Sequence, residues 1–403
     1  MDDVDYDVII IGAGPVGSRA ATLLCERGLK VLVLEEHNEI GRPFQCAGLV
    51  NPSAMESVKL EHTILKEIHS AKMHSPAGIS IQIGQPHKVR TYTVCRKKFD
   101  QAVAKQAVDS GARISLNSKP EDVQITDSHV ELFVNLDGER ILLKSKLLIG
   151  ADGAHSWTRR KFKMGRPKEL MIGYQVEVTG YQTDDGVLEM YTGEDIAPGF
   201  FSWVIPTGFG THRIGMWSKA ELQNGKSSEQ MLHYLMKESK WSDRFSECSV
   251  VAQYCGPVPS GMVKKPYKDR VMLLGDAAGM AKPTTGGGIG PGFEQIQEII
   301  GPLVSAINSN TLGEKNLKKI CKHWYKMKGD QDTARKLRNL LVSDLSDEEL
   351  DNHFTEFSRP DVIELINKVA DIEKPVPIGI ALLRKVPAFR KLALKSSFVY
   401  LFG

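Results

Sequence analysis

The stretch YDVIIIGAGPVGSRAATLLCERGLKVLVLEE, residues 6–36, decides the fold of this chain. Residues 6–11 form an apolar run, interrupted only by Asp7 and rich in β-branched side chains, which is typical of a buried parallel strand. Gly12, Gly14 and Gly17 then form a G-x-G-x-x-G pattern at the start of an expected helix, and residues 30–34 predict a second strand. Such glycines allow a tight turn, a close approach of a pyrophosphate and close helix–strand packing. The stretch therefore predicts a dinucleotide-binding βαβ unit, and the alternative is a glycine-rich turn with a coincidental acid.

The acid in question is Glu35, which ends the second expected strand. A carboxylate at this position binds ribose hydroxyls, and the helix that begins near Pro15 offers free N–H groups to a phosphate. We therefore expect Pro15, Glu35 and the adjacent Glu36 in the nucleotide site.

Two distant segments indicate which dinucleotide binds. LLIGADGAHSWTRR (147–160) runs from a strand into a turn that contains Asp152, and RVMLLGDAAGMAKPTTGGGIGPGFEQ (270–295) runs from another strand into Asp276. With the first motif they resemble the three fingerprints of FAD enzymes of the aromatic-hydroxylase (glutathione-reductase-like) superfamily. The resemblance implies FAD as the cofactor and Asp276 on its ribityl or pyrophosphate portion. It also implies that a loop with Gly286, Gly287, Gly288 and Ile289 faces the flavin ring, where backbone N–H groups and a helix dipole stabilise the anionic reduced form.

Arg96 lies at the head of an expected helix in VCRKKFDQAVAKQAVDSGA (94–112). Its place resembles that of the arginine which these enzymes set beside the FAD phosphates. The alternative is a solvated charge at a helix start. Arg42 completes the basic residues that we expect near the cofactor.

The segment APGFFSWVIPTGFGTHRIGM (197–216) resembles the P-x-x-Y-x-W-x-(F)-P segment of the geranylgeranyl reductase family. CAGLV (46–50) lies where that family has its Cys-Gly motif, although it is one residue shorter than C-x-E-G-L and lacks the acid. The resemblance covers about residues 1–310 and implies saturation of isoprenoid double bonds, in archaea those of digeranylgeranylglycerol lipids. It implies that Phe201, Trp203 and Pro206 line the substrate site. By strand alternation Phe201 and Trp203 share one face and Phe200 the other, and packing in a sheet is the alternative role for all three.

Cys46, Ala47 and Gly48 are expected beneath the flavin ring, with Gly48 letting the backbone pass close to it. A thiol there is a candidate donor of a proton to the carbon that does not receive hydride. The alternative is a small side chain that only fits under the ring.

The expected fold class is α/β, with a Rossmann-type FAD-binding domain, an inserted domain with a mostly antiparallel sheet and a C-terminal helical region. We expect the FAD-binding domain at 1–75, 96–165 and 265–310, the substrate domain at 76–95 and 166–264, and the helical region at 311–403.

The composition is that of an ordinary globular protein, with 41% hydrophobic residues, 25% charged residues and a net charge of +3. This balance argues against a dedicated nucleic-acid binder. The six cysteines form no C-x-x-C pair, which argues against an iron–sulfur or structural zinc site, and we expect no metal. With no apolar run long enough to span a bilayer, the expected location is cytoplasmic. The basic, amphipathic segment 380–403 either contacts the inner face of the membrane or packs on its own protein.

Two functions remain open on this sequence. One is a prenyl reductase that takes electrons from ferredoxin, a deazaflavin or NAD(P)H, and the other is an FAD monooxygenase of an aromatic or isoprenoid substrate. The motifs fit both equally well, and only the monooxygenase needs dioxygen. A non-catalytic prenyl-binding protein is a further alternative, which predicts that bound flavin is absent or not reducible.

Overall fold

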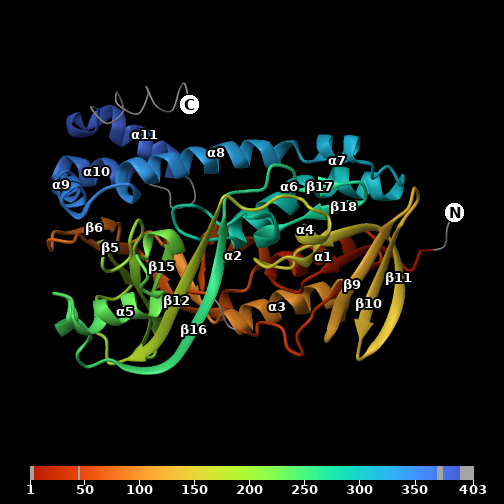
Figure 1. Cartoon of the computed structure of the whole chain (residues 1–403), viewed down its shortest axis with the longest axis horizontal. Helices are drawn as coiled ribbons and strands as arrows, with labels where there is room; N and C mark the ends of the chain where they lie inside the picture. Colours follow the sequence, from red (N-terminus) through yellow and green to blue (C-terminus); the bar gives the residue numbers. More distant parts are fainter. Residues whose placement is uncertain (1–3, 44–45, 370–374, 391–403) are drawn as a thin grey trace.

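The computed structural model describes residues 4–43, 46–369 and 375–390. Two large β-sheets lie side by side, and a row of helices from the C-terminal part of the chain crosses one side of both (Figure 1). The expected fold class, a Rossmann-type α/β unit with a second, mostly antiparallel sheet and C-terminal helices, is confirmed.

The first sheet has eight strands and is built around the N-terminal motif. β1 pairs in parallel with β2 and with the second half of β11, because the apolar runs of all three are buried on both faces. The first half of β11 instead forms an antiparallel meander with β9 and β10. The strands are β1 (Tyr6–Ile11), β2 (Val31–Leu34), β8 (Arg113–Ser115), β9 (Ser118–Ile125), β10 (Val130–Leu136), β11 (Glu139–Gly150), β17 (Tyr267–Lys268) and β18 (Val271–Leu273).

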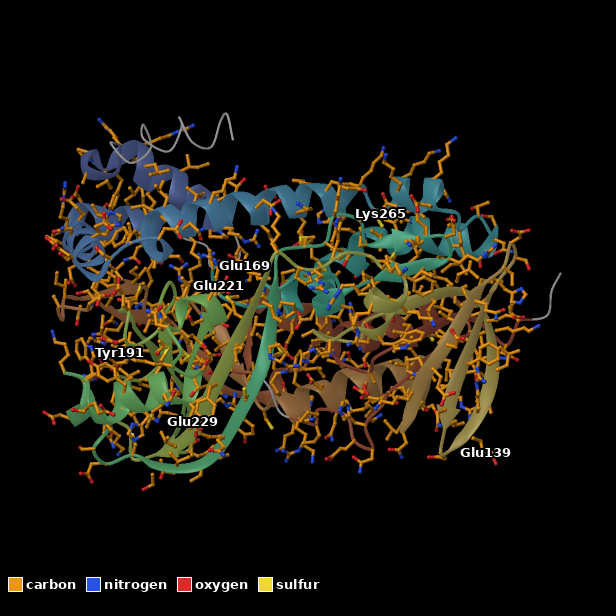
Figure 2. All side chains as sticks on the ribbon, in the orientation of Figure 1. Glu139, Glu169, Tyr191, Glu221, Glu229 and Lys265 are labelled. Atoms are coloured by element: carbon orange, nitrogen blue, oxygen red, sulfur yellow. The ribbon has the colours of Figure 1, made fainter. Side chains whose placement is uncertain are left out.

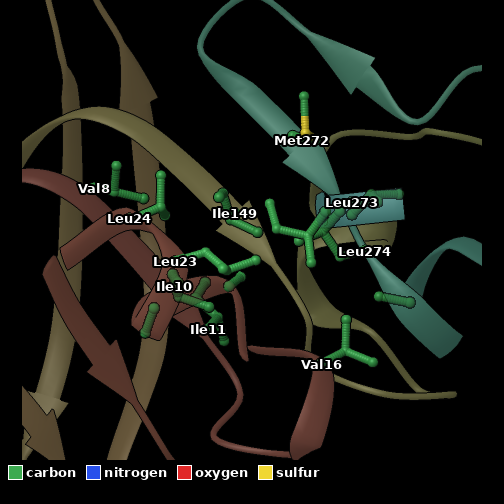
Figure 3. Packing of buried hydrophobic residues seen from close by; sticks show 14 of the residues in the cluster. Val8, Ile10, Ile11, Val16, Leu23, Leu24, Ile149, Met272, Leu273 and Leu274 are labelled. Carbon is green, nitrogen blue, oxygen red and sulfur yellow. The ribbon is translucent and has the colours of Figure 1, made fainter. Parts of the chain in front are cut away.

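Helices pack on this sheet through apolar faces. Leu23 and Val16 of α1 meet Ile149 of β11 and Leu273 of β18 in one continuous core (Figure 3). This packing holds the turn after β1 and the turn after β18 at the same edge of the sheet. The helices of this part are α1 (Pro15–Cys25), α2 (Pro52–Val58), α3 (Arg96–Asp109), α4 (Trp157–Lys161) and α6 (Ile289–Asn308).

The second sheet has seven strands in the order β16-β12-β15-β14-β13-β5-β6, and all neighbours are antiparallel except β13 and β5. α5 (Ser228–Lys237) covers one of its faces with a buried apolar cluster. The strands are β5 (Ser70–His74), β6 (Ser80–Gly84), β12 (Glu169–Thr179), β13 (Val187–Tyr191), β14 (Ser202–Gly208), β15 (Thr211–Lys219) and β16 (Ser249–Ser260).

Residues 76–95, which we expected in the substrate domain, do not match the strands that form the seven-stranded sheet. The seven-stranded sheet already includes β5, and it leaves out β7 (Thr91–Val94), which pairs with β3 (Leu49–Val50) and β4 (Ile64–Ile68) in a separate three-stranded sheet. The reason is local: the turn residues after position 75 form the hairpin between β5 and β6, not a domain boundary.

The last three of the C-terminal helices cover the β5–β6 end of the second sheet. Ile81 of β6 is buried with Phe354, Phe357 and Ile366 from two of them, and Gly84 donates its N–H to Asn367 at 2.8 Å. None of the described helices is both long and apolar enough to cross a membrane. The helices are α7 (Glu314–Ile320), α8 (Lys322–Arg338), α9 (Asp347–Phe357), α10 (Pro360–Val369) and α11 (Pro375–Lys385).

Candidate active site

One cavity of about 1280 Å³ is lined by residues of both large sheets and of the C-terminal helices. It begins at the glycine-rich turn after β1 and continues along the face of the seven-stranded sheet. Its volume exceeds the roughly 300–1,000 Å³ of a typical single-ligand site. There is therefore room for a dinucleotide and a second ligand.

The three motif glycines have three different surroundings. Gly12 has φ +101°, and a Cβ there would lie 2.4 Å from the carbonyl oxygen of Ala151. A Cβ on Gly17 would lie 2.1 Å from the carbonyl oxygen of Gly12, so Gly17 serves helix–strand packing and does not line the cavity. Gly14 does line the cavity, and a Cβ there would meet no atom of the described chain within 4 Å. The open space beside Gly14 is where the motif places a pyrophosphate.

Glu35 directly follows β2 and faces the same turn. Its Oε2 accepts the N–H of Ala13 at 2.9 Å, and its Oε1 accepts the N–H of His37 at 3.1 Å. Glu35, Glu36 and Pro15 all line the cavity. The two backbone N–H groups thus hold the Glu35 carboxylate on the cavity wall beside the glycine-rich turn.

Asp152 has one satisfied and one unsatisfied oxygen. Its Oδ2 accepts from the N–H and the hydroxyl of Thr158, each at 2.9 Å, whereas its buried Oδ1 has no hydrogen-bond partner among the described residues. A buried carboxylate oxygen without a partner is costly, and here it lies on the cavity wall. A ligand hydroxyl of FAD fits this acceptor.

Arg96 and Asp276 lie on the cavity wall from two different elements. Arg96 donates to Asp100 through Nε at 3.1 Å and Nη2 at 2.9 Å. Although burial opposes its charge, the Asp100 carboxylate holds the pKa of Arg96 above its ordinary value. Burial raises the pKa of Asp276 to about 6, against the opposing attraction of Arg96 and Arg159.

We expect Asp276→Asn to stabilise the FAD-free protein increasingly as the pH rises. A raised pKa means that the folded chain binds the proton more tightly than the unfolded chain, so the protonated carboxyl favours folding at low pH. That contribution is lost as the pH rises through about 6, and asparagine stays neutral throughout. The difference in unfolding free energy between variant and wild type should grow by up to about 3 kcal/mol between pH values of about 4 and 7. Urea unfolding across this range measures it, and a difference that does not change with pH would contradict the assignment.

Cys46 and Ala47 line the cavity, whereas Gly48 does not. The Cys46 sulfur accepts the N–H of Gly48 at 3.4 Å and interacts with the Arg96 guanidinium. A Cβ on Gly48 would lie 2.1 Å from Nη1 of Arg213, which donates to the carbonyl of Ala47 at 2.9 Å. The expectation that Gly48 makes room for the flavin ring is therefore wrong, because Arg213 of β15 occupies that space.

The loop of residues 282–288, here called the flavin loop, lies between Asp276 and α6. Gly286, Gly287, Gly288 and Ile289 all line the cavity. A Cβ on Gly288 would lie 2.5 Å from Oδ1 of Asp276, and one on Gly286 would lie 2.3 Å from the ring of Trp217. The glycines thus let the loop pass between an acid and an indole.

Trp217 of β15 is the centre of an aromatic wall. The rings of Phe200, Phe201 and Trp203 lie 5.4, 5.9 and 6.4 Å from the Trp217 ring, and all four side chains line the cavity. The expectation that Phe200 faces away from the other two is wrong, because β14 begins only at Ser202 and alternation does not hold before it. Pro206 is buried in the sheet and does not line the cavity.

Sequence reasoning missed the apolar arm of the cavity, which lies beyond this wall. Its residues come from β5, β6, β13 and β14 on one side and from α9, α10 and α11 on the other. The alternation of apolar residues in the strands was a signal for it, but the helices are too far away in sequence to be paired with them. The arm residues are Met73, Ile81, Ile83, Leu188, Met190, Ile205, Phe354, Phe357, Ile366, Ile378 and Leu382.

Comparison with known proteins identifies the family of this chain. A family model described as an FAD binding domain matches residues 5–309, so the chain belongs to the FAD-binding domain family and its cofactor is FAD. The chain is 31% identical over 364 residues to the digeranylgeranylglycerophospholipid reductase of Methanosarcina acetivorans, covering 87% of this chain and 88% of that protein. It is also 31% identical over 394 residues to digeranylgeranylglycerophospholipid reductase 2 of Methanothermobacter thermautotrophicus, covering 94% and 99% of the two chains. Within the flavoproteins it is therefore a member of the geranylgeranyl reductase family.

A solved structure shows the same fold. The geranylgeranyl bacteriochlorophyll reductase-like protein from Thermoplasma acidophilum superposes with a TM-score of 0.85 at 24% identity, covering 96% of this chain and 98% of that one.

Proposed function

We propose that this protein is an FAD-dependent reductase that saturates the double bonds of geranylgeranyl chains, most specifically those of digeranylgeranylglycerol membrane lipids. One observation carries the proposal: a single cavity joins the dinucleotide turn to a long apolar arm. FAD is held by residues that the motifs bring together from distant parts of the chain. They are Gly12, Gly14, Pro15, Glu35, Glu36, Arg42, Cys46, Ala47, Arg96, Asp152, Asp276, Gly286, Gly287, Gly288 and Ile289.

The length of the arm fits a prenyl chain. The arm crosses the sheet from Trp217 of β15 to Ile81 of β6, which are separated by four strand-to-strand steps. Four steps span about 19 Å at roughly 4.8 Å each. A linear hydrocarbon advances about 1.25 Å per carbon–carbon bond of roughly 1.5 Å, so about fifteen chain carbons fill this length. Such a site favours a long isoprenoid over a single aromatic ring.

Different residues of the chain have different roles in the proposed reduction. Bound FAD in its reduced form supplies a hydride donor. The aromatic wall around Trp217 would exclude water and hold the alkene, and the Cys46 sulfur on the cavity wall would be the proton donor. Cys46 would give a proton to the alkene carbon that does not receive hydride, and the resulting thiolate would regain a proton from solvent before the next turnover.

The test is turnover without oxygen. The purified protein is incubated anaerobically with a digeranylgeranylglycerophospholipid and, in separate reactions, with reduced ferredoxin, a reduced deazaflavin or NAD(P)H. We expect mass spectrometry to show the addition of two hydrogens for each double bond reduced with at least one donor. Turnover only in air, with insertion of oxygen, would instead establish a monooxygenase.

We expect Trp203→Ala to lower kcat/KM for a long prenyl substrate at least about tenfold, the equivalent of about 1.4 kcal/mol of lost apolar contact. Trp203 lines the cavity and donates Nε1–H to Gln175 at 3.1 Å. Reduction of the bound flavin by dithionite should be unchanged. Phe209→Ala is the matched control, because this aromatic in the same hairpin is 96% exposed. An equal loss of flavin reduction and alkene reduction would contradict a substrate-lining role.

We also propose that the protein contacts a membrane surface through its C-terminal basic helix. Arg384 and Lys385 lie in the last turn of α11, the helix that supplies Leu382 to the apolar arm. The segment 391–403, which continues the basic pattern, lies outside the described residues. Cosedimentation with anionic but not with neutral vesicles is the expected result, and equal binding to both would contradict it.

A further inference from the structure

Three buried polar side chains lie on one face of α8. Gln331, Arg335 and Arg338 are spaced four and three residues apart and are at most 9% exposed. Gln331 donates Nε2–H to the carbonyl of Met280 at 3.0 Å, and Arg338 donates Nη1–H to the carbonyl of Pro283 at 2.8 Å. α8 therefore contacts the beginning of the flavin loop directly.

Glu169 fixes the same arginine from the substrate sheet. It lies at the end of β12 nearest α8 (Figure 2) and accepts from Arg338 at 2.8 and 3.2 Å. Arg335 and Lys219 donate to the same carboxylate at 3.0 and 2.9 Å. Although burial opposes its charge, these cations, Arg338 first, hold the pKa of Glu169 at about 2.

The guanidinium of Arg338 also touches the aromatic wall. It lies 4.6 Å from the ring centre of Phe200, whose ring packs on Trp217. Trp217 in turn packs against Gly286 of the flavin loop. The loop is thus held at Pro283 by a hydrogen bond and at Gly286 by an aromatic contact, and both supports connect to Arg338.

Residues close to Arg338 in the chain line the cavity. Residues Asn339–Ser343 form a π-helical turn, a feature that is frequent at functional sites. Leu337 and Leu341, on either side of Arg338, line the cavity. One short segment therefore contacts the flavin loop and the wall of the apolar arm.

We propose that Arg338 is a positioning residue that fixes the flavin loop against the substrate wall and thereby places the loop N–H groups beside the flavin ring. The planar guanidinium donates hydrogen bonds to Glu169 and to the Pro283 carbonyl and also lies against the Phe200 ring. A lysine ammonium does not make all three contacts at once. This proposal deepens the proposed function. It rests on that function only for the alkene substrate, because the family match already gives FAD as the cofactor.

The test compares Arg338→Met, Arg338→Lys and the control Lys219→Met. Glu169 keeps two cationic partners in each variant, so the buried carboxylate stays paired. In the FAD-free protein, Arg338→Met and Arg338→Lys should speed hydrogen exchange of the amides at 284–288 about tenfold. In the loaded protein, reduced flavin should bind about tenfold less tightly relative to oxidised flavin, which lowers the two-electron midpoint potential by about 30 mV. Lys219→Met, which does not contact the loop, should change neither.

Three outcomes would overturn the proposal. Exchange and potential unchanged in Arg338→Met would show that the loop does not depend on this side chain. Wild-type behaviour of Arg338→Lys would show that only the charge matters, and equal effects of Lys219→Met would assign them to the ion cluster as a whole. None of these measurements uses a lipid. A wild-type protein that fails to reduce prenyl chains therefore disproves the proposed function without touching this inference.

Discussion

Gly14→Ala is expected to give a folded protein that binds FAD at least about a hundredfold more weakly, a loss of about 2.7 kcal/mol. Gly14 has φ −62° and ψ 174°, a conformation open to any residue, and its Cβ would meet nothing within 4 Å in the FAD-free chain. The added methyl would lie in the space where the motif places the pyrophosphate. Calorimetric titration with FAD and thermal unfolding of the FAD-free protein measure the two halves of this prediction.

Gly17→Ala is the contrasting variant. Its Cβ would lie 2.1 Å from the backbone oxygen of Gly12, so the FAD-free protein itself should lose stability. Stoichiometric FAD in Gly14→Ala would show that the pyrophosphate lies elsewhere. Equal destabilisation of the two FAD-free variants would show that the cavity at Gly14 is not open.

Cys46→Ala is expected to lower alkene reduction about a hundredfold or more, the usual contribution of a positioned proton donor. The sulfur lies on the cavity wall. The nearby Arg96 guanidinium donates two hydrogen bonds to Asp100, so the carboxylate of Asp100 is its counterion. In the FAD-loaded protein, reduction of the flavin by dithionite should be unchanged, because the substitution removes only the thiol. Single-turnover reduction of a prenyl lipid by the pre-reduced protein isolates this step.

Two variants test whether the thiol or only its volume matters. Cys46→Ser keeps an O–H donor of similar size and should retain more activity than Cys46→Ala. Cys255→Ala removes a second cysteine that lines the cavity, from β16, and should have no comparable effect. Alkene reduction unchanged in Cys46→Ala would leave Cys46 with a packing role.

The sequence by itself determined the FAD-binding part of this protein. The strand, the glycine turn, the helix and Glu35 lie within residues 6–36, so local backbone preferences alone produce the βαβ unit. Asp152 and Asp276 each lie within three residues of the end of a buried strand, and the resemblance to the FAD fingerprints indicated both of them. The same resemblance indicated the glycine-rich loop that contains Gly286.

Only the tertiary structure decided the substrate side. Gly48 is required by Arg213, and Arg338 bonds to the Pro283 carbonyl; both contacts join residues far apart in the chain. Residues 311–403 were expected to be helical, yet an apolar periodicity says that a helix buries a face and not what that face covers. Here α9, α10 and α11 cover the β5–β6 end of the sheet, and the space between these helices and the sheet is the apolar arm. Its length and lining depend on how elements pack at a distance, which no local stretch of sequence encodes.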